Sequence, residues 1–497
     1  MQLSGKALEE LDPLVISKLN AIIPRIVDRD FNIWGSSSEA KNRMGWLDSP
    51  ANSRKLLTEL DSISAWVRSK NYESFVLCGM GGSSLAPEVI TATSGKRLTI
   101  LDSTLPEQVK KATPTNLEKS VIVIASKSGT TIETLSHLKY FKGLFEKVKL
   151  DPTEHLLIIT DPNTPLDKEY RKLGYKVFNA DPSVGGRYSA LTIFGLLPSA
   201  LVGCDTSILL DDAEEASKLL GRENSAAVKI AAILYSKTDQ IVNFTDSTES
   251  LPGLAGWIEQ LIAESTGKNG TGRLPVVHSQ PRVNLDNLSI GFEDGSFDLI
   301  VNATLGEHFI LWQWSTALLC YLLSVDPFNQ PNVASAKAKT QSILLGSESV
   351  NALNLVLNNS DFEIKSNLQI KSVGEFLKLN RQYYAILAYL PKDSESLSTL
   401  LQKTISMRTN TPTTFGWGPR YLHSTGQIHK GGQLNGGFIL ITHQIEQDLT
   451  IPNESFTFGQ LALAQAMGDA QSLTELELPI LQIHLKNLKT NLIDIFN

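Results

Sequence analysis

Glycines and small hydroxyl-bearing residues follow two apolar runs in the first third of the chain. The first run leads into Gly-Met-Gly-Gly-Ser at residues 79–83, and the second leads into Ser-Lys-Ser-Gly-Thr-Thr at residues 126–131. A short apolar run before a helical stretch is typical of a buried parallel strand. The turn after such a strand directs backbone N–H groups and a helix N-terminus at one point. Two such turns on one sheet would suit a phosphate dianion, so we expect a small phosphorylated ligand.

The two loops differ in specificity. Glycines let an oxyanion approach the backbone at Gly82 and Ser83, but a structural tight turn explains the same glycines about as well. The second loop is harder to explain by packing, because it places four hydroxyls and a lysine at one strand end. This composition favours phosphate binding over an ordinary capped turn.

Three further residues could act on the ligand itself. Arg187, in Gly-Gly-Arg-Tyr-Ser at residues 185–189, could hold a developing oxyanion with its fixed fork of donors, although a surface ion pair is the simpler explanation of a lone arginine. Gln260 and Glu264 lie four apart near the end of a helix expected over residues 254–268. A tuned carboxylate there could be a general base, whereas periodicity alone favours a solvated glutamate.

Two later segments also carry candidates. Lys337 lies two turns into a helix that opens after Phe-Asn-Gln-Pro at residues 328–331. His423 lies in a polar, glycine-rich loop, where a histidine is better placed for proton transfer than on an apolar helix. His308 lies on an apolar helix, which indicates packing.

Alternating apolar runs and helical patterns predict the elements that hold these residues. Strands are expected at residues 74–79, 98–102, 120–125, 155–160, 176–179, 240–244, 274–277, 299–303, 384–390, 437–442 and 480–484. Helices are expected at residues 131–147, 190–203, 306–325, 394–408 and 456–470. This alternation predicts an α/β fold of two doubly wound subdomains, with mainly parallel sheets flanked by helices. We divide the chain into an N-terminal helical segment (1–50), a first subdomain (51–205) and a second subdomain (206–497).

Composition narrows the class of protein. The chain has 497 residues, of which 42% are apolar and 20% charged, so two or three ordinary globular domains are expected. A net charge of −7 gives no reason to expect nucleic acid or an anionic membrane as partner. Cys78, Cys204 and Cys320 lack metal-ligand spacing and are expected to be buried thiols in a reducing compartment. The N-terminus is too polar for a signal peptide, and the longest apolar stretch (190–203) is shorter than the ~20 residues that span a bilayer. We expect a cytoplasmic protein.

Taken in order, these motifs resemble those of phosphoglucose isomerases, a family built from two sugar-isomerase-type (SIS) subdomains. The matching pieces run from residue 79 to residue 337. The loops at 79–83 and 126–131 resemble the two phosphate loops of that family. The resemblance implies substrate contacts at Gly82, Ser83, Ser126, Lys127, Ser128 and Thr131.

The same resemblance implies catalytic roles. Gly-Gly-Arg-Tyr-Ser resembles the Gly-Gly-Arg-Phe/Tyr-Ser of the family, which makes Arg187 the stabiliser of an enediolate. Glu264 falls where the family has the base that moves a proton between C2 and C1, and Gln260 matches a ligand-contacting glutamine. The segment at 328–337 resembles Phe-Asp-Gln-x-Gly-Val-Glu-x-x-Lys, which gives a ligand-contacting Gln330 and a catalytic Lys337.

The chain also departs from the family pattern. The usual Asp, Gly and Glu of the lysine motif are replaced by Asn329, Asn332 and Ala334. The ring-opening histidine of the family should precede Lys337, yet the matching Leu-His-Ser-x-Gly-Gln motif surrounds His423, after the lysine. We expect that this segment has moved within the second subdomain and returns His423 to the same pocket.

This rearranged order resembles the isomerase half of bifunctional transaldolase–phosphoglucose isomerase proteins. A transaldolase barrel would need a couple of hundred residues upstream, so isomerase activity alone is expected. The resemblance implies interconversion of glucose 6-phosphate and fructose 6-phosphate through a cis-enediol(ate), without cofactor or metal, by a possible homodimer. One alternative is an enzyme that also accepts mannose 6-phosphate, which Thr266 leaves open. The other is a non-catalytic sugar-phosphate sensor, which would have no reason to keep Glu264.

Overall fold

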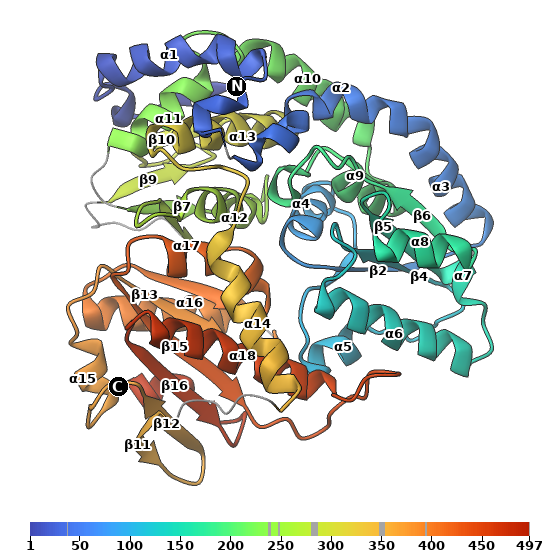
Figure 1. Ribbon diagram of the computed structural model, residues 1–497, viewed down its shortest axis with the longest axis vertical. Helices are drawn as coiled ribbons and strands as arrows, with labels where there is room; N and C mark the ends of the chain where they lie inside the picture. Colours follow the sequence, from blue (N-terminus) through green and yellow to red (C-terminus); the bar gives the residue numbers. More distant parts are fainter. Residues whose placement is uncertain are drawn as a thin grey trace. The chain divides into compact units, whose positions relative to one another are not determined.

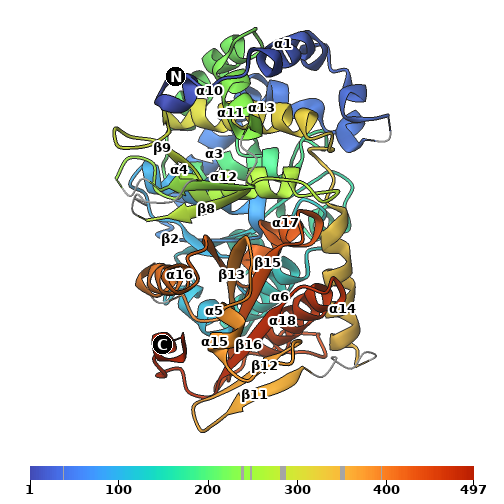
Figure 2. The same ribbon diagram turned by 90° about the vertical axis from the view of Figure 1, so that its left-hand side faces the viewer.

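Aliphatic and β-branched runs form three β-sheets in the computed structural model, which describes residues 1–36, 38–236, 240–246, 249–279, 287–346, 353–392 and 395–496. The chain divides into two units. Unit 1 comprises Met1–Asp102, Ala112–Thr266 and Thr271–Asn329, and unit 2 comprises Ser103–Lys111, Gly267–Gly270 and Gln330–Asn497. Unit 1 is drawn mainly from blue to yellow and unit 2 mainly from orange to red in Figures 1 and 2.

The first sheet of unit 1 is fully parallel and has the strand order β3-β2-β4-β5-β6. Its central strand β4 reads Ser-Val-Ile-Val-Ile-Ala, and all six residues are buried, as expected for a parallel strand covered on both faces. The strands are β2 (Ser74–Gly79), β3 (Thr99–Leu101), β4 (Ser120–Ala125), β5 (Leu156–Thr160) and β6 (Lys176–Asn179). The five strands predicted in this region are confirmed.

Helices cover both faces of this sheet. α4 and α9 lie on one side of the strands, whereas α6 lies on the other (Figure 1). The helices around this sheet are α3 (Leu57–Ser69), α4 (Leu85–Thr93), α6 (Ile132–Lys147), α7 (Pro152–His155), α8 (Pro165–Lys172) and α9 (Ile193–Leu201). From β2 the chain crosses to β3 at one edge, and from β4 it proceeds to β5 in the opposite direction. The carboxyl ends of β2 and β4 therefore flank the topological switch point, where ligands bind in open α/β sheets.

The second sheet of unit 1 has the order β1-β10-β9-β7-β8, with β1 antiparallel to β10 and the other pairs parallel. Its strands are β1 (Gln2–Ser4), β7 (Ile241–Thr245), β8 (Leu274–His278), β9 (Leu288–Gly291) and β10 (Leu299–Asn302). Its helices are α10 (Thr206–Leu220), α11 (Ala226–Ser236), α12 (Leu254–Thr266) and α13 (Leu305–Leu322). The N-terminal segment is mainly helical, with α1 (Pro13–Val27) and α2 (Ser49–Ser53), but it begins with the unexpected strand β1.

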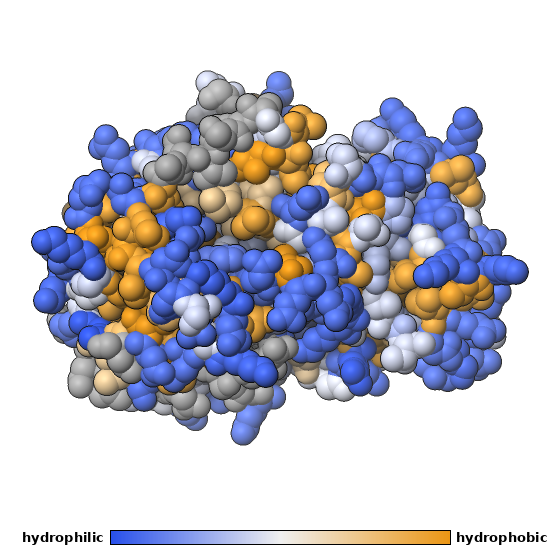
Figure 3. Space-filling view, turned by 90° about the horizontal axis from the view of Figure 1, so that it is seen from below, coloured by the Kyte–Doolittle hydropathy of each residue, from blue (hydrophilic) through white to orange (hydrophobic). Residues whose placement is uncertain are grey.

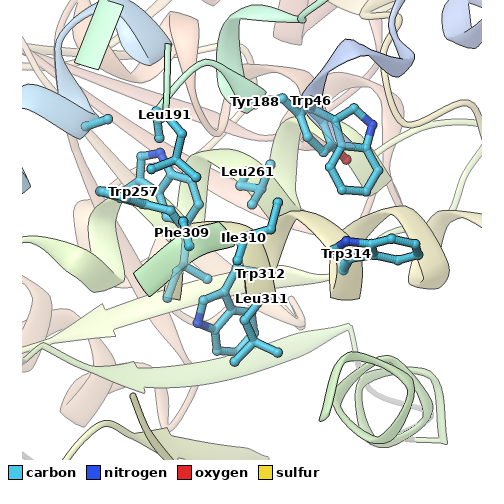
Figure 4. Close-up of a cluster of buried hydrophobic side chains, with 14 of the residues drawn as sticks. Trp46, Tyr188, Leu191, Trp257, Leu261, Phe309, Ile310, Leu311, Trp312 and Trp314 are labelled. Atoms are coloured by element: carbon cyan, nitrogen blue, oxygen red, sulfur yellow. The ribbon is translucent and has the colours of Figure 1, made fainter. Parts of the chain in front are cut away.

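Aromatic side chains join these elements into one core in unit 1. Figure 4 shows Trp257 and Phe309 together, and their ring centroids on α12 and α13 are 4.8 Å apart. Trp46 packs on Tyr188 with a centroid distance of 5.5 Å and on Trp314 with one of 5.4 Å. Because Tyr188 follows Arg187, this packing fixes the backbone that carries the arginine.

Unit 2 holds the third sheet, with the order β11-β12-β16-β15-β13-β14. The β13, β14, β15 and β16 ladders are parallel, and the β11–β12 hairpin adds antiparallel strands at one edge. The strands are β11 (Asn354–Asn358), β12 (Phe362–Ser366), β13 (Tyr383–Ala388), β14 (Thr413–Trp417), β15 (Gly436–His443) and β16 (Ile480–Leu485). The helices beyond residue 330 are α14 (Ala334–Leu344), α15 (Val373–Leu377), α16 (Glu395–Thr409), α17 (Gly426–Gly431), α18 (Phe458–Glu475) and α19 (Leu492–Phe496). One more helix, α5, spans Pro106–Ala112.

The predicted α/β class with mainly parallel sheets flanked by helices is confirmed, but the number of sheets differs. Residues 206–497 were expected to form one subdomain, whereas the described part of this range contributes to two separate sheets. The second half therefore contains more β-structure than its clearest apolar runs indicate.

On the face drawn in Figure 3, hydrophobic residues lie between many hydrophilic ones. Leu14 and Met407 are among the large apolar side chains that are exposed. Among the described residues, we find no helix with the length and apolar character needed to cross a bilayer.

Candidate active site

The first loop begins directly after β2. Gly81 adopts a φ of +54°, which glycine tolerates well, and Ser83 is buried at the start of the approach to α4. A Cβ added to Gly82 would lie 2.2 Å from the carbonyl oxygen of Gly186. The Ser189 hydroxyl also donates to the Gly82 carbonyl at 3.4 Å. Glycine at 82 thus allows the first loop to touch the backbone beside Arg187.

The second loop begins after β4, whose last residue is paired with the last residue of β2. Ser126 Oγ donates to Thr131 Oγ1 at 3.0 Å, and the hydroxyls of Ser128 and Thr130 lie 2.9 Å apart. Thr131 is the N-cap residue of the 16-residue helix α6, although its side chain makes no capping hydrogen bond. The loop therefore places hydroxyls at the positive end of a long helix, which suits an anion.

Lys127 differs from its neighbours in this loop. Its ammonium donates to Asp161 Oδ1 at 2.6 Å and to the Asp181 carbonyl at 3.1 Å. Burial lowers the pKa of Lys127 from its ordinary value, while Asp161 opposes that effect. The contacts of its ammonium therefore lie on the loops after β5 and β6, and not among the hydroxyls with which the sequence grouped it.

Arg187 and Glu264 form a buried ion pair. Arg187 Nη1 lies 2.8 Å from Glu264 Oε1, and their side chains are 4% and 8% exposed. Arg187 Nε donates to Ser265 Oγ at 2.8 Å, and Nη2 donates to the carbonyls of Pro327 and Asn329 at 2.7 and 3.0 Å. The surface ion pair considered for Arg187 is therefore wrong.

Gln260 holds the other oxygen of the same carboxylate. Its Nε2 donates to Glu264 Oε2 at 3.0 Å, one helical turn along α12. The solvated glutamate that periodicity favoured is wrong, because Glu264 is buried between these two donors. Helix α12 also packs against the short helices that contain Gly82 and Arg187. Unit 1 thus brings together the first loop, Arg187, Gln260 and Glu264.

Other side chains of this cluster were not found from the sequence. Ser265 accepts from Arg187, and its carbonyl in turn accepts a weak bond from Cys320 Sγ at 3.4 Å. The only sequence signal for Ser265 was its position beside Glu264. Cys320, like Cys78 and Cys204, is buried as predicted.

The remaining candidates lie in unit 2. Gln330 and Lys337 are exposed, at the N-cap of a short 3-10 helix (Pro331–Val333) and on α14 respectively. His423 is partly buried at the end of the 3-10 helix Arg420–His423. The roles of Gln330, Lys337 and His423 stay predictions.

A buried carboxylate fixes the chain on both sides of His423. Asp469 on α18 accepts from Tyr421 Oη at 2.8 Å and lies 2.5 Å from Lys430 Nζ. The Lys430 and Asp469 side chains are 3% and 1% exposed. Burial raises the pKa of Tyr421 well above its usual value, so its hydroxyl stays a donor to Asp469. The segment from 421 to 430 is thus held at both ends.

The arrangement in unit 1 suits one kind of chemistry. A buried carboxylate beside an arginine can move a proton next to a carbonyl while the cation stabilises the resulting oxyanion. The described residues contain no group of three or more His, Cys, Asp or Glu side chains that could hold a metal.

Two solved structures share this α/β fold. A crystal structure of a hypothetical protein from Thermus thermophilus aligns with a TM-score of 0.57 and 25% identity, over 69% of this chain and all of that one. A glucose-6-phosphate isomerase from Chlamydia trachomatis shares the fold with a TM-score of 0.55 at 16% identity, over 67% of this chain and 86% of that one.

Sequence comparison matches part of the chain to a known family. Residues 50–280 match the family model for phosphoglucose isomerase. The chain is 36% identical to a glucose-6-phosphate isomerase of Thermus thermophilus, over 46% of this chain and 57% of that protein. It is 26% identical to a probable glucose-6-phosphate isomerase of Methanococcus maripaludis, over 62% of this chain and 86% of that protein. The match thus covers little more than half the length of the first relative. The matched residues 50–280 include both loops, Arg187 and Glu264.

Proposed function

We propose that this chain interconverts glucose 6-phosphate and fructose 6-phosphate. The observation that carries the proposal is the buried 2.8 Å contact between Arg187 and Glu264, with the first loop packed against the same arginine backbone. The names of the similar proteins support glucose 6-phosphate as one of the two sugars.

The proposed mechanism is a proton transfer through a cis-enediol(ate). The phosphate is anchored by the loops at 79–83 and 126–131, which positions the sugar and reduces the entropic cost of the reaction. Glu264 removes the proton from C2 of the open-chain aldose and returns it to C1, while the hydroxyl proton of O2 passes to O1 so that the carbonyl moves to C2. Arg187 stabilises the enediolate oxygen through its permanent charge, and Gln260 orients the carboxylate from the opposite oxygen.

Ring opening needs a second set of groups. We assign proton transfer at the ring oxygen and the C1 hydroxyl to His423 and Lys337, as the resemblance implies, with Gln330 on the ligand. Neither a metal nor a cofactor is part of this proposal. The cytoplasm as location, a homodimeric state and the kinship with the bifunctional proteins are proposals that rest on the resemblance alone.

No specific observation favours either alternative function, the isomerase that also accepts mannose 6-phosphate or the non-catalytic sensor. Thr266 Oγ1 donates to the Ile262 carbonyl at 2.7 Å and accepts from Arg273 N at 3.0 Å, so its hydroxyl is committed to the helix end. It gives no support for mannose 6-phosphate as a further substrate. A sensor does not need a base held by two donors, as Glu264 is.

The decisive experiment measures fructose 6-phosphate formation from glucose 6-phosphate in the presence of EDTA. We expect turnover by the wild type and a loss of about 10²- to 10⁴-fold in Glu264→Gln, with ligand binding retained. His423→Ala should also be slower. Glu259→Gln, on the same helix, is the matched control and should keep full activity. If the wild type bound the ligand without turnover, the protein would be a sugar-phosphate sensor and the proposed enzymatic function would be wrong.

A further inference from the structure

The side chain of Gln427 on α17 is fully buried, and its amide group is used at both ends. Its Nε2 donates to the carbonyl of Gly267 and to Oδ1 of Asn332, each at 2.8 Å. Its Oε1 accepts from the backbone N–H of Asn332 at 3.0 Å. A glutamine amide has two donor hydrogens and one acceptor oxygen, so this side chain is satisfied by two chain segments.

Glycines allow these segments to come close enough. A Cβ at Gly267 would lie 2.3 Å from the Cα of Ile428, and a Cβ at Gly431 would lie 2.5 Å from Asn332 Oδ1. The backbone N–H of Gly270 also donates to the Gly431 carbonyl at 3.0 Å. Helix α17 is therefore seated directly on the segment Gly267–Gly270, and the fit leaves no space for larger residues.

The three segments joined by Gln427 are those next to the proposed catalytic residues in the chain. Gly267 follows Glu264 by three positions, Asn332 precedes Lys337 by five, and Gln427 follows His423 by four. Leaving a buried amide without one of its hydrogen-bond partners costs far more free energy than doing so at the surface. This junction therefore favours a single arrangement of the three segments relative to one another.

Asn332 stands where the family motif quoted for the lysine segment has glycine. A glycine at that position could offer Gln427 its backbone N–H but no side-chain oxygen. The acceptor Oδ1 is therefore present because this chain has asparagine where the family motif has glycine. The same chain also has the His423 motif at a displaced position.

We propose that Gln427 and Asn332 are a positioning pair, which sets the register of the His423 loop against the lysine-bearing segment. This inference rests on the proposed function, since it assigns the pair a task in the same reaction. The pair does not touch the substrate; it acts through His423.

The test compares Gln427→Met, which has a similar volume but no hydrogen-bonding amide, with His423→Ala and the double variant. We expect kcat to fall at least 10-fold in Gln427→Met while KM changes by less than about threefold. The double variant should be no slower than His423→Ala alone, because a positioning residue has nothing left to position. Additive losses would indicate a merely structural role and overturn the proposal.

Asn332 supplies the conservative control. Asn332→Asp keeps an acceptor oxygen for Gln427 and should retain nearly full activity, whereas Asn332→Ala should resemble Gln427→Met. Hydrogen exchange over residues 420–431 gives a readout that is independent of turnover. The exchange rate should rise at least tenfold in Gln427→Met and Asn332→Ala but not in Asn332→Asp. Unchanged exchange rates in all three variants would overturn the proposal that Gln427 and Asn332 act as a pair. A wild type without turnover would instead refute the proposed function, and the exchange data would still decide on the pair.

Discussion

The guanidinium of Arg187 serves four acceptors at once, two of which are side chains and two carbonyls. Lysine would keep the charge but not the planar fork, so Arg187→Lys should leave several buried acceptors unsatisfied. We expect kcat/KM to fall by about 10²- to 10³-fold, the usual loss for an oxyanion-stabilising donor. The free energy of unfolding should fall by about 2 kcal/mol or more. Steady-state kinetics and urea titration measure the two effects.

Arg171 offers the matched control for that substitution. Its guanidinium bonds Asp167 at 2.7 Å, but its side chain is 51% exposed. Because exposed ion pairs contribute little, Arg171→Lys should change stability by less than about 1 kcal/mol and leave activity intact. If Arg171→Lys and Arg187→Lys had equal effects on activity and stability, the proposed role of Arg187 in stabilising the oxyanion would be wrong.

His429 predicts how stability depends on pH. Burial, aided by the nearby Lys430, lowers the pKa of His429 from 6.5 to about 3, and its Nδ1 lies 3.1 Å from Tyr383 Oη. Between these pH values the unfolded chain binds a proton that the folded chain does not. Stability should therefore fall on acidification below about pH 6.5, by up to about 1.4 kcal/mol per pH unit from this residue.

The variant His429→Gln isolates this effect, because glutamine can still accept from Tyr383 but does not titrate. The free energy of unfolding of unit 2, followed from pH 7 to pH 4, should fall less steeply in the variant than in the wild type. Parallel curves would show that His429 already takes up its proton in the folded state.

The types of the site residues were readable from the sequence, but their surroundings were not. Gln260 and Glu264 were found by their spacing, yet helical periodicity indicated a solvated face. That expectation failed because α12 is buried nearly all round, with Gly256 and Glu259 as the exceptions. The partner of Lys127 is likewise set by the loop after β5, which local sequence does not report.

The approach of the first loop to the Arg187 loop requires glycine at 82. A Cβ there would meet backbone atoms of residues 186 and 187 at 2.2 to 2.9 Å, and backbone cannot move aside as a flexible side chain can. Gly82→Ala should therefore separate the two loops and displace Arg187. We expect at least a 100-fold loss in kcat/KM, together with weaker binding of fructose 6-phosphate in calorimetry.

Gly256, on the helix of Glu264, is the control for that substitution. Nothing lies within 4 Å of its built Cβ, so Gly256→Ala should stabilise α12 by about 0.5–1 kcal/mol and keep activity. If Gly82→Ala were as active as Gly256→Ala, the close approach of the loops would have no catalytic meaning.

The most apolar strands were predictable, whereas the two edge strands of the third sheet were not. The apolar runs of β2, β4 and β5 mark strands covered on both faces. β11 and β14 lie at the two edges of the third sheet, where one neighbour is missing and the apolar pattern weakens. β11 is mostly exposed along its length, so its sequence lacks the apolar run by which a buried strand is predicted.

Each unit has its own hydrophobic core, and the proposed work is divided between them. One core lies within residues 7–328 of unit 1, and another joins β12, β13, β15 and β16 of unit 2. The proposed phosphate loops, Arg187 and Glu264 belong to unit 1, and the ring-opening candidates belong to unit 2. The sequence grouped residues 206–329 with the C-terminal part because helix–strand alternation continues through both, and only tertiary packing assigns them to unit 1.

This division predicts that substrate binding and ring opening can be separated in the intact chain. Of the seven tryptophans, six lie in unit 1 and Trp417 lies in unit 2, so tryptophan fluorescence mainly reports unfolding of unit 1. Fructose 6-phosphate at 100 times its Kd should stabilise unit 1 by about 2.7 kcal/mol. Lys337→Met should keep this stabilisation while losing turnover, because the phosphate contacts are all proposed for unit 1. Ser126→Ala, in the second loop, should reduce the stabilisation at the same ligand concentration. If Lys337→Met abolished the stabilisation instead, the lysine would belong to substrate binding and the division would be wrong.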